Sequence, residues 1–167
     1  MLYTSAEANK LLKKLNDQYL DLRNQEEKTK TFNAATMEDV EAVRPAYDYA
    51  KSQVTLSEIQ NEIRHVKHAI NIFNVSTNVP GFDMTIDEML VYIPQLTRNK
   101  NKLANMKAIL PKERVEDGTY RNSNFIDYRY ANYDLSQVEA DYERVSDELT
   151  KAQLALDQIN NSLKFEI

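Results

Sequence analysis

The sequence predicts an all-α protein: an antiparallel bundle of long helices with coiled-coil-like seams and an extended, tyrosine-rich excursion between the last two helices. Two observations predict this fold. Apolar residues recur in alternating steps of three and four over long stretches, which places them on one face of a helix. Only 2 Gly and 4 Pro occur among 167 residues, too few for the many tight turns of a β-sandwich or barrel. We therefore expect a single helical domain over residues 1–167, with helices at about 5–28, 46–73, 86–110 and 135–163.

Two of these helices begin at a capping-box pattern, a Thr followed three residues later by a Glu. In this pattern the Thr hydroxyl accepts a backbone N–H and the Glu carboxylate reaches back to the N–H of the Thr. Thr4 with Glu7, and Thr85 with Glu88, have the required spacing. Pro94 lies well inside the third helix, where we expect a kink because proline removes a backbone hydrogen bond.

The second and fourth helices carry narrow apolar stripes with a period near 3.5 residues, which favours a long neighbouring helix. We expect these side chains to form a core seam or a self-association seam. They are Leu56, Ile59, Ile63, Val66, Ile70, Leu135, Val138, Tyr142, Val145, Leu149, Leu156, Ile159 and Leu163. Because long helices with such seams also pair between chains, we expect a homo-oligomer.

Opposite charges on two segments predict that the third and fourth helices run antiparallel. Residues 98–114 hold six basic residues and one acidic residue, a net charge of +5. Residues 134–150 hold six acidic residues and one basic residue, a net charge of −5. Asp134, which begins the second stretch, is also the expected N-cap of the last helix. Each exposed ion pair contributes about 0–1 kcal/mol, so the charges select orientation more than they stabilise.

The connection over residues 111–133 holds the candidate binding residues. Such long connections are uncommon in small helical domains and often carry function. Tyrosine suits contact surfaces because its ring is apolar and its tip is polar. The candidates are Tyr128, Arg129, Tyr130 and Tyr133. The alternative is that the tyrosines hold the excursion against the helices.

Glu62, His65 and His68 form a Glu-x-x-His-x-x-His run, a weak candidate for a metal site. A di-metal centre of the ferritin type needs two Glu-x-x-His motifs on separate helices, and the chain has only 2 His and no Cys. Neither a glycine-rich phosphate loop nor a Gly-x-Ser-x-Gly nucleophile pattern occurs. The absence of these catalytic patterns favours a non-enzymatic protein without a cofactor. A metal-dependent enzyme that uses Glu62, His65 and His68 is the alternative.

Composition bears on partners and location. The net charge of −5 argues against nucleic acid as a partner. The most apolar run, residues 89–93, is far shorter than the ~20 residues of a membrane-spanning helix, so we expect no transmembrane segment. The first residues lack the basic and apolar regions of a signal peptide. We therefore expect a cytoplasmic protein that contacts copies of itself or another protein.

Several short motifs together resemble a known family. They are Lys67-His68-Ala69-Ile70-Asn71, Leu110-Pro111-Lys112-x-Arg114, Tyr128-Arg129-Tyr130-x-Asn132-Tyr133-Asp134-Leu135, Asp141-Tyr142-Glu143 and Ala155-Leu156-Asp157. In order and spacing the set resembles the septicolysin-like family of small, mostly helical bacterial proteins without an established activity. The resemblance spans residues 8–167 and implies a helical hairpin bundle. The family name implies a membrane-active, cytolysin-like protein, but no catalytic or pore-lining residue is carried over.

Three functions are thus expected in order of preference. The first is a non-enzymatic helical interaction or scaffold protein that self-associates, because the seams are unbroken and no catalytic constellation stands out. The second is the membrane-active protein that the family name implies. The third is the metal-dependent enzyme built on Glu62, His65 and His68.

Overall fold

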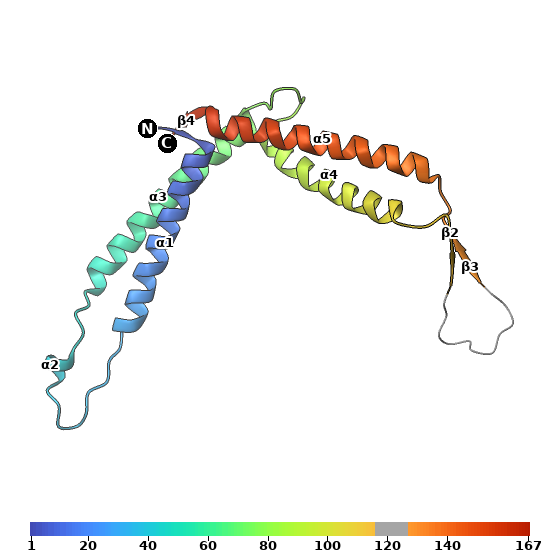
Figure 1. Cartoon of the computed structure of the whole chain (residues 1–167). Coiled ribbons are helices and arrows are strands. Elements are labelled where there is room, and N and C mark those ends of the chain that lie inside the picture. Colours follow the sequence, from blue (N-terminus) through green and yellow to red (C-terminus); the bar gives the residue numbers. More distant parts are fainter. Residues whose placement is uncertain (116–126) are drawn as a thin grey trace, which may run out of the picture. The chain divides into compact units, whose positions relative to one another are not determined.

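The protein is mostly helical, with two small strand pairs in the part of the chain that the structure describes, residues 1–115 and 127–167 (Figure 1). The computed structural model divides the chain into two compact units. Unit 1 comprises Met1–Thr77 and Gln158–Ile167, and unit 2 comprises Asn78–Asp157.

Unit 1 is a helical hairpin closed by a pair of short strands. Its helices α1 (Ser5–Thr29) and α3 (Tyr49–Ser76) lie side by side (Figure 1). They run antiparallel, because Gln60 of α3 donates to the Tyr19 hydroxyl at 2.9 Å while Gln53 donates to Glu26 at 2.7 Å. The elements are β1 (Leu2–Thr4), α1 (Ser5–Thr29), α2 (Val40–Val43), α3 (Tyr49–Ser76) and β4 (Lys164–Glu166).

The core of unit 1 lies between α1 and α3. Ala8, Leu15, Val66 and Ile70 are buried there. The partly buried side chains around them are Tyr3, Leu11, Leu12, Ile63, Phe165 and Ile167. Burial of such apolar area stabilises the fold by about 25 cal/mol per Å².

The two ends of the chain pair with each other. β1 and β4 are antiparallel, with Tyr3 opposite Phe165. The amino group of Met1 donates to the Ile167 carbonyl at 2.8 Å, and the Ile167 N–H donates to the Met1 carbonyl at 3.0 Å. Sequence periodicity did not predict these strands, since each is only three residues long.

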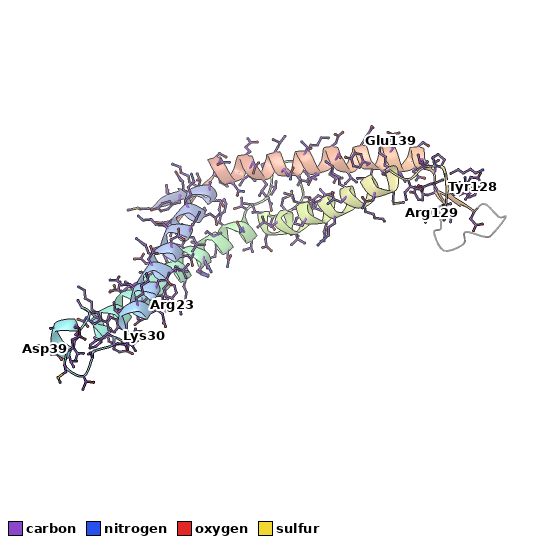
Figure 2. The ribbon with its side chains drawn as sticks, turned by 60° about the horizontal axis from the view of Figure 1, so that its bottom comes forward. Arg23, Lys30, Asp39, Tyr128, Arg129 and Glu139 are labelled. Atoms are coloured by element: carbon purple, nitrogen blue, oxygen red, sulfur yellow. The ribbon has the colours of Figure 1, made fainter. Side chains whose placement is uncertain are left out.

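Unit 2 is a second helical hairpin with a two-stranded ribbon at one end. The Lys107 amine lies 2.7 Å from the Glu139 carboxylate, and the Tyr92 hydroxyl donates to Glu148. The later residue of α4 (Ile86–Lys107) contacts the earlier residue of α5 (Leu135–Ser162), so the two helices are antiparallel. They lie side by side in both views (Figures 1 and 2). The elements are α4 (Ile86–Lys107), β2 (Lys112–Arg114), β3 (Tyr128–Tyr130) and α5 (Leu135–Ser162), of which α5 extends past Asp157 into unit 1.

The apolar stripes of unit 2 form its core. The buried side chains are Val79, Ile86, Met89, Leu96, Val138, Val145, Leu149, Ala152 and Leu156. The buried side chains on α5 belong to the apolar stripe whose residues recur in steps of three and four in the sequence. The stripe stops earlier than expected, because α5 ends at Ser162 and Leu163 is 45% exposed. The chain leaves the helix there to pair Lys164–Glu166 with β1.

Helix boundaries differ from the expectations mainly at α3 and α4. α3 spans Tyr49–Ser76 rather than 46–73, because Asp48 is its N-cap and accepts from the Lys51 N–H. α4 ends at Lys107 rather than at residue 110. Of the excursion over 111–133, residues 116–126 lie outside the described part.

The two expected capping boxes are present in the structure. Thr4 Oγ1 accepts the Glu7 N–H at 3.2 Å, and the Glu7 carboxylate accepts the Thr4 N–H at 2.8 Å. Thr85 and Glu88 form the same box at α4. α4 continues through Pro94 to Lys107 as one helix.

Candidate binding surface

The β2–β3 ribbon gathers aromatic and basic side chains on one of its faces. The strands are antiparallel, and Lys112 lies opposite Tyr130 while Arg114 lies opposite Tyr128. Residues that lie opposite each other share a face, and successive residues along a strand alternate between faces. Lys112, Arg114, Tyr128 and Tyr130 therefore form one face, which we call the ribbon face. Arg129 lies on the other face, opposite Glu113.

The ribbon face is exposed, and its lysine contacts both of its rings. The Lys112 amine lies 4.0 Å from the centre of the Tyr128 ring and 5.5 Å from that of the Tyr130 ring. Such cation–π contacts stabilise by about 0.5–1 kcal/mol at exposed sites. Tyr128 is 45% and Tyr130 61% exposed, and Figure 2 shows Tyr128 and Arg129 on the ribbon. The arrangement presents two cations beside two rings, a surface suited to an anionic partner.

Other tyrosines of unit 2 hold the ribbon and helices in place. The Tyr133 hydroxyl donates to the Met106 carbonyl at 2.8 Å, which ties the start of α5 to the end of α4. The Tyr142 ring lies under two amines, with Lys107 at 5.3 Å and Lys100 at 5.8 Å from its centre. Tyr133 therefore contacts the end of α4, as the anchoring alternative expects, and Tyr128, Arg129 and Tyr130 stay candidates for binding.

The ion pair between α4 and α5 agrees with the antiparallel direction that the charge pattern predicted. The hydrogen bond to Glu139 raises the pKa of the Lys107 amine, and the same bond lowers the pKa of the Glu139 carboxyl. Both side chains are largely exposed, so solvent screens the pair. Figure 2 shows Glu139 on α5. The pair therefore contributes little to stability.

The candidate metal ligands are not gathered into a centre. Glu62, His65 and His68 are all exposed on α3. In the described part of the chain, no three or more side chains of His, Cys, Asp or Glu are grouped so that they could hold a metal ion. The two histidines instead border open surface pockets of about 550 and 530 Å³, both of which include His65 and Ile167.

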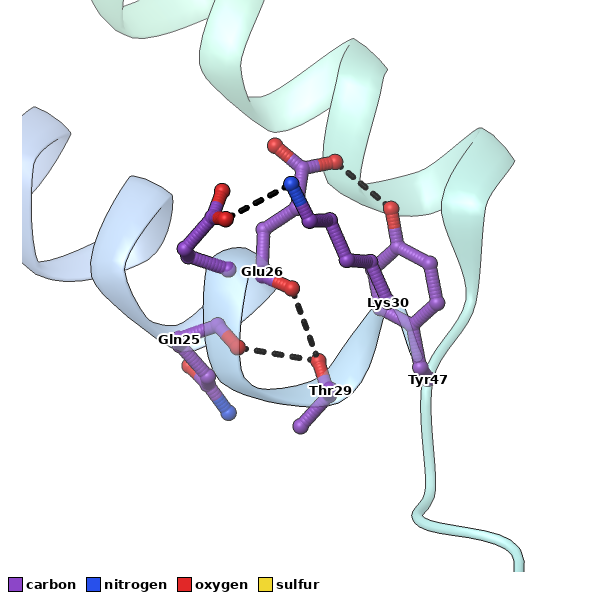
Figure 3. Close-up of polar contacts among 6 residues, drawn as sticks. Gln25, Glu26, Thr29, Lys30 and Tyr47 are labelled. Atoms are coloured by element: carbon purple, nitrogen blue, oxygen red, sulfur yellow. Dashed lines mark hydrogen bonds and ion pairs between the residues drawn. The ribbon is translucent and has the colours of Figure 1, made fainter. Parts of the chain in front are cut away.

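A polar cluster at the far end of the unit 1 hairpin was not expected from the sequence (Figure 3). Glu26 Oε1 accepts hydrogen bonds from the Tyr47 hydroxyl at 2.6 Å and from Gln53 Nε2 at 2.7 Å. The bond to Glu26 raises the pKa of Tyr47 to about 12. Glu26 and Tyr47 also border a shallow pocket of about 370 Å³. The cluster fastens the connection before α3 to the end of α1.

No helix in residues 1–115 and 127–167 combines the length and the apolar character that crossing a membrane requires.

Comparison with known proteins supports the fold and indicates no function. No protein-family model and no curated protein matches the chain. A solved structure does match it: the crystal structure of a functionally unknown conserved protein from Corynebacterium diphtheriae. The match has a TM-score of 0.62, covers 99% of this chain and 100% of that chain, and has 16% sequence identity. At this identity the likeness shows the fold alone, and the septicolysin-like resemblance stays a prediction.

Proposed function

We propose that the protein is a non-enzymatic interaction or scaffold protein that self-associates through the outer faces of its helical hairpins. A hairpin of two amphipathic helices buries one stripe of each helix against the other. Any apolar side chain outside that stripe stays in water unless another surface covers it. The proposal therefore depends on what lies outside the buried stripes.

Large apolar side chains lie exposed along the helices of both units, and this observation carries the proposal. They are Leu20, Val54, Ile72, Val75, Leu90, Val91 and Leu154. Single exposed apolar residues are common, but neighbouring ones are typical of surfaces that bind other proteins. Ile72 and Val75 lie on one turn of α3, and Leu90 and Val91 adjoin on α4.

The ribbon face supports a second contact within the same function. Lys112 and Arg114 carry positive charge beside the exposed rings of Tyr128 and Tyr130. Aromatic and basic side chains are enriched where proteins bind each other. An acidic protein surface would complement this face.

Sedimentation velocity with light scattering tests self-association directly. We expect the average mass to rise with concentration from 19.4 kDa to at least twice that value. A mass that stays at 19.4 kDa up to the solubility limit would contradict the proposal. Circular dichroism on the same samples shows whether the helices are intact in each measurement.

A further inference from the structure

One face of α4 carries an apolar residue followed by two basic residues. Val91, Arg98 and Lys102 follow each other in steps of seven and four residues, which places them on one helical face. All three are exposed, and Val91 is 57% exposed. We call these three residues the α4 outer face.

One face of α5 carries the complementary series in the opposite direction. Leu154, Asp147 and Glu143 follow each other in steps of seven and four residues towards the start of the helix. All three are exposed, and Leu154 is 65% exposed. We call these three residues the α5 outer face.

The four charges on these faces take part in no ion pair within the described part of the chain. The ion pairs of unit 2 use other residues, namely Lys107 with Glu139 and Arg144 with Asp141. Glu143 contributes only a longer-range field, which raises the pKa of Lys107. The charges of both outer faces are therefore available to a partner.

We infer that the α4 outer face of one copy binds the α5 outer face of a second copy, side by side and antiparallel. The facing pairs are Val91 with Leu154, Arg98 with Asp147 and Lys102 with Glu143. The direction and approximate register are those that the helices already have within one chain, where Lys107 contacts Glu139 and Lys100 lies over Tyr142. The same helical geometry is thus used twice.

This interface rests on the proposed self-association and names the surface that carries it. The two faces differ, so the contact is heterologous, and repetition of it builds a ring or an open chain of copies. The apolar pair contributes buried area, while the two charged pairs fix register and direction. Because these pairs lie at the surface, added salt weakens the assembly.

Charge reversal tests the interface. The α4 variant carries Arg98→Glu and Lys102→Glu, and the α5 variant carries Glu143→Lys and Asp147→Lys. In each variant alone, like charges meet across the interface, and we expect the dissociation constant to rise roughly tenfold or more. An equimolar mixture of the two variants brings opposite charges together again, so it assembles as the wild type does.

Matched controls lie on α1, where exposed pairs have the same four-residue spacing. Lys10→Glu with Lys14→Glu changes net charge as the α4 variant does. Asp17→Lys with Asp21→Lys matches the α5 variant. Both controls keep the assembly of the wild type, and circular dichroism checks that every variant keeps its helices.

Three outcomes would overturn the interface. Wild-type protein that assembles while both reversed variants keep the wild-type mass would place self-association on another surface. A mixture whose dissociation constant stays as high as that of either variant alone would contradict the facing pairs. Wild-type protein that is monomeric throughout would overturn the proposed function together with the interface.

Discussion

The ring of Phe165 on β4 stacks on the ring of Phe73 on α3, with centroids 4.4 Å apart and planes inclined by 19°. Phe73 is buried and Phe165 is half-buried. The contact therefore attaches the terminal strand pair to the helical hairpin of unit 1.

Phe165→Ala is expected to lower the free energy of unfolding by about 2 kcal/mol, less than for a fully buried phenylalanine because the ring is partly in water. Urea unfolding followed by circular dichroism measures the change. Tyr49→Ala, at an exposed position on α3, is the control and shifts stability by less than about 0.5 kcal/mol. Equal effects of the two variants would show that the stack contributes nothing.

Acid is expected to weaken both capping boxes. Hydrogen bonds from the backbone N–H of Thr4 and of Thr85 lower the pKa of Glu7 and of Glu88 below the ordinary 4.5. A carboxylate with a lowered pKa in the folded state stabilises fully above 4.5, and this stabilisation is lost as the pH falls through the lowered value. The urea concentration at the unfolding midpoint should decrease as the pH falls below 4.5. In Glu88→Gln this decrease should be smaller. An identical pH dependence in Glu88→Gln would count against the box.

Tyr47 is expected to lose its proton at a higher pH than an ordinary tyrosine. Its hydrogen bond to Glu26 raises its pKa from 10.0 to about 12. The bond favours the protonated hydroxyl, so its stabilising effect is complete below pH 10.0 and is lost as the pH rises through about 12. Absorbance titration of tyrosinate measures this, with Tyr47→Phe assigning the signal. Glu26→Gln should move the titration back towards 10.0, and an unchanged titration would contradict the contact.

Two tyrosines of unit 2 should respond differently to loss of the hydroxyl alone. Tyr133→Phe removes the hydrogen bond to the Met106 carbonyl and should cost about 1 kcal/mol of stability. Tyr130→Phe is the matched control, since its ring is 61% exposed and the change should be within about 0.5 kcal/mol. Thermal unfolding compares them. A larger loss for Tyr130→Phe would reverse the roles of anchor and contact residue.

Local sequence information accounts for most of the helical architecture. Val138, Val145 and Leu149 are buried because a spacing of three and four residues places them on one face whatever the rest of the chain does. Capping boxes are equally local, since their partners are three residues apart. The antiparallel direction of α4 and α5 followed from charge, and the contact of Lys107 with Glu139 agrees with it.

Features that join distant residues could not be predicted in this way. The strand pair joins Leu2–Thr4 to Lys164–Glu166, and three residues are too few to show a strand period. The ribbon face depends on the register of β2 against β3, which places Lys112 opposite Tyr130. Glu26 and Tyr47 meet across a connection whose pattern indicated neither helix nor strand. In each case the sequence shows the residue, but it does not show which distant residue lies against it.

The hydrogen bonds between Met1 and Ile167 join positions 166 residues apart and have a consequence for the order of folding. Closing a chain of that length costs about 4.5 kcal/mol of entropy, about 2 kcal/mol more than closing the connection between α1 and α3. Helical signal should therefore return first in refolding kinetics. Closure of the strands that carry Phe165 should form a later, slower phase, and that phase should be lost when the first four residues are deleted.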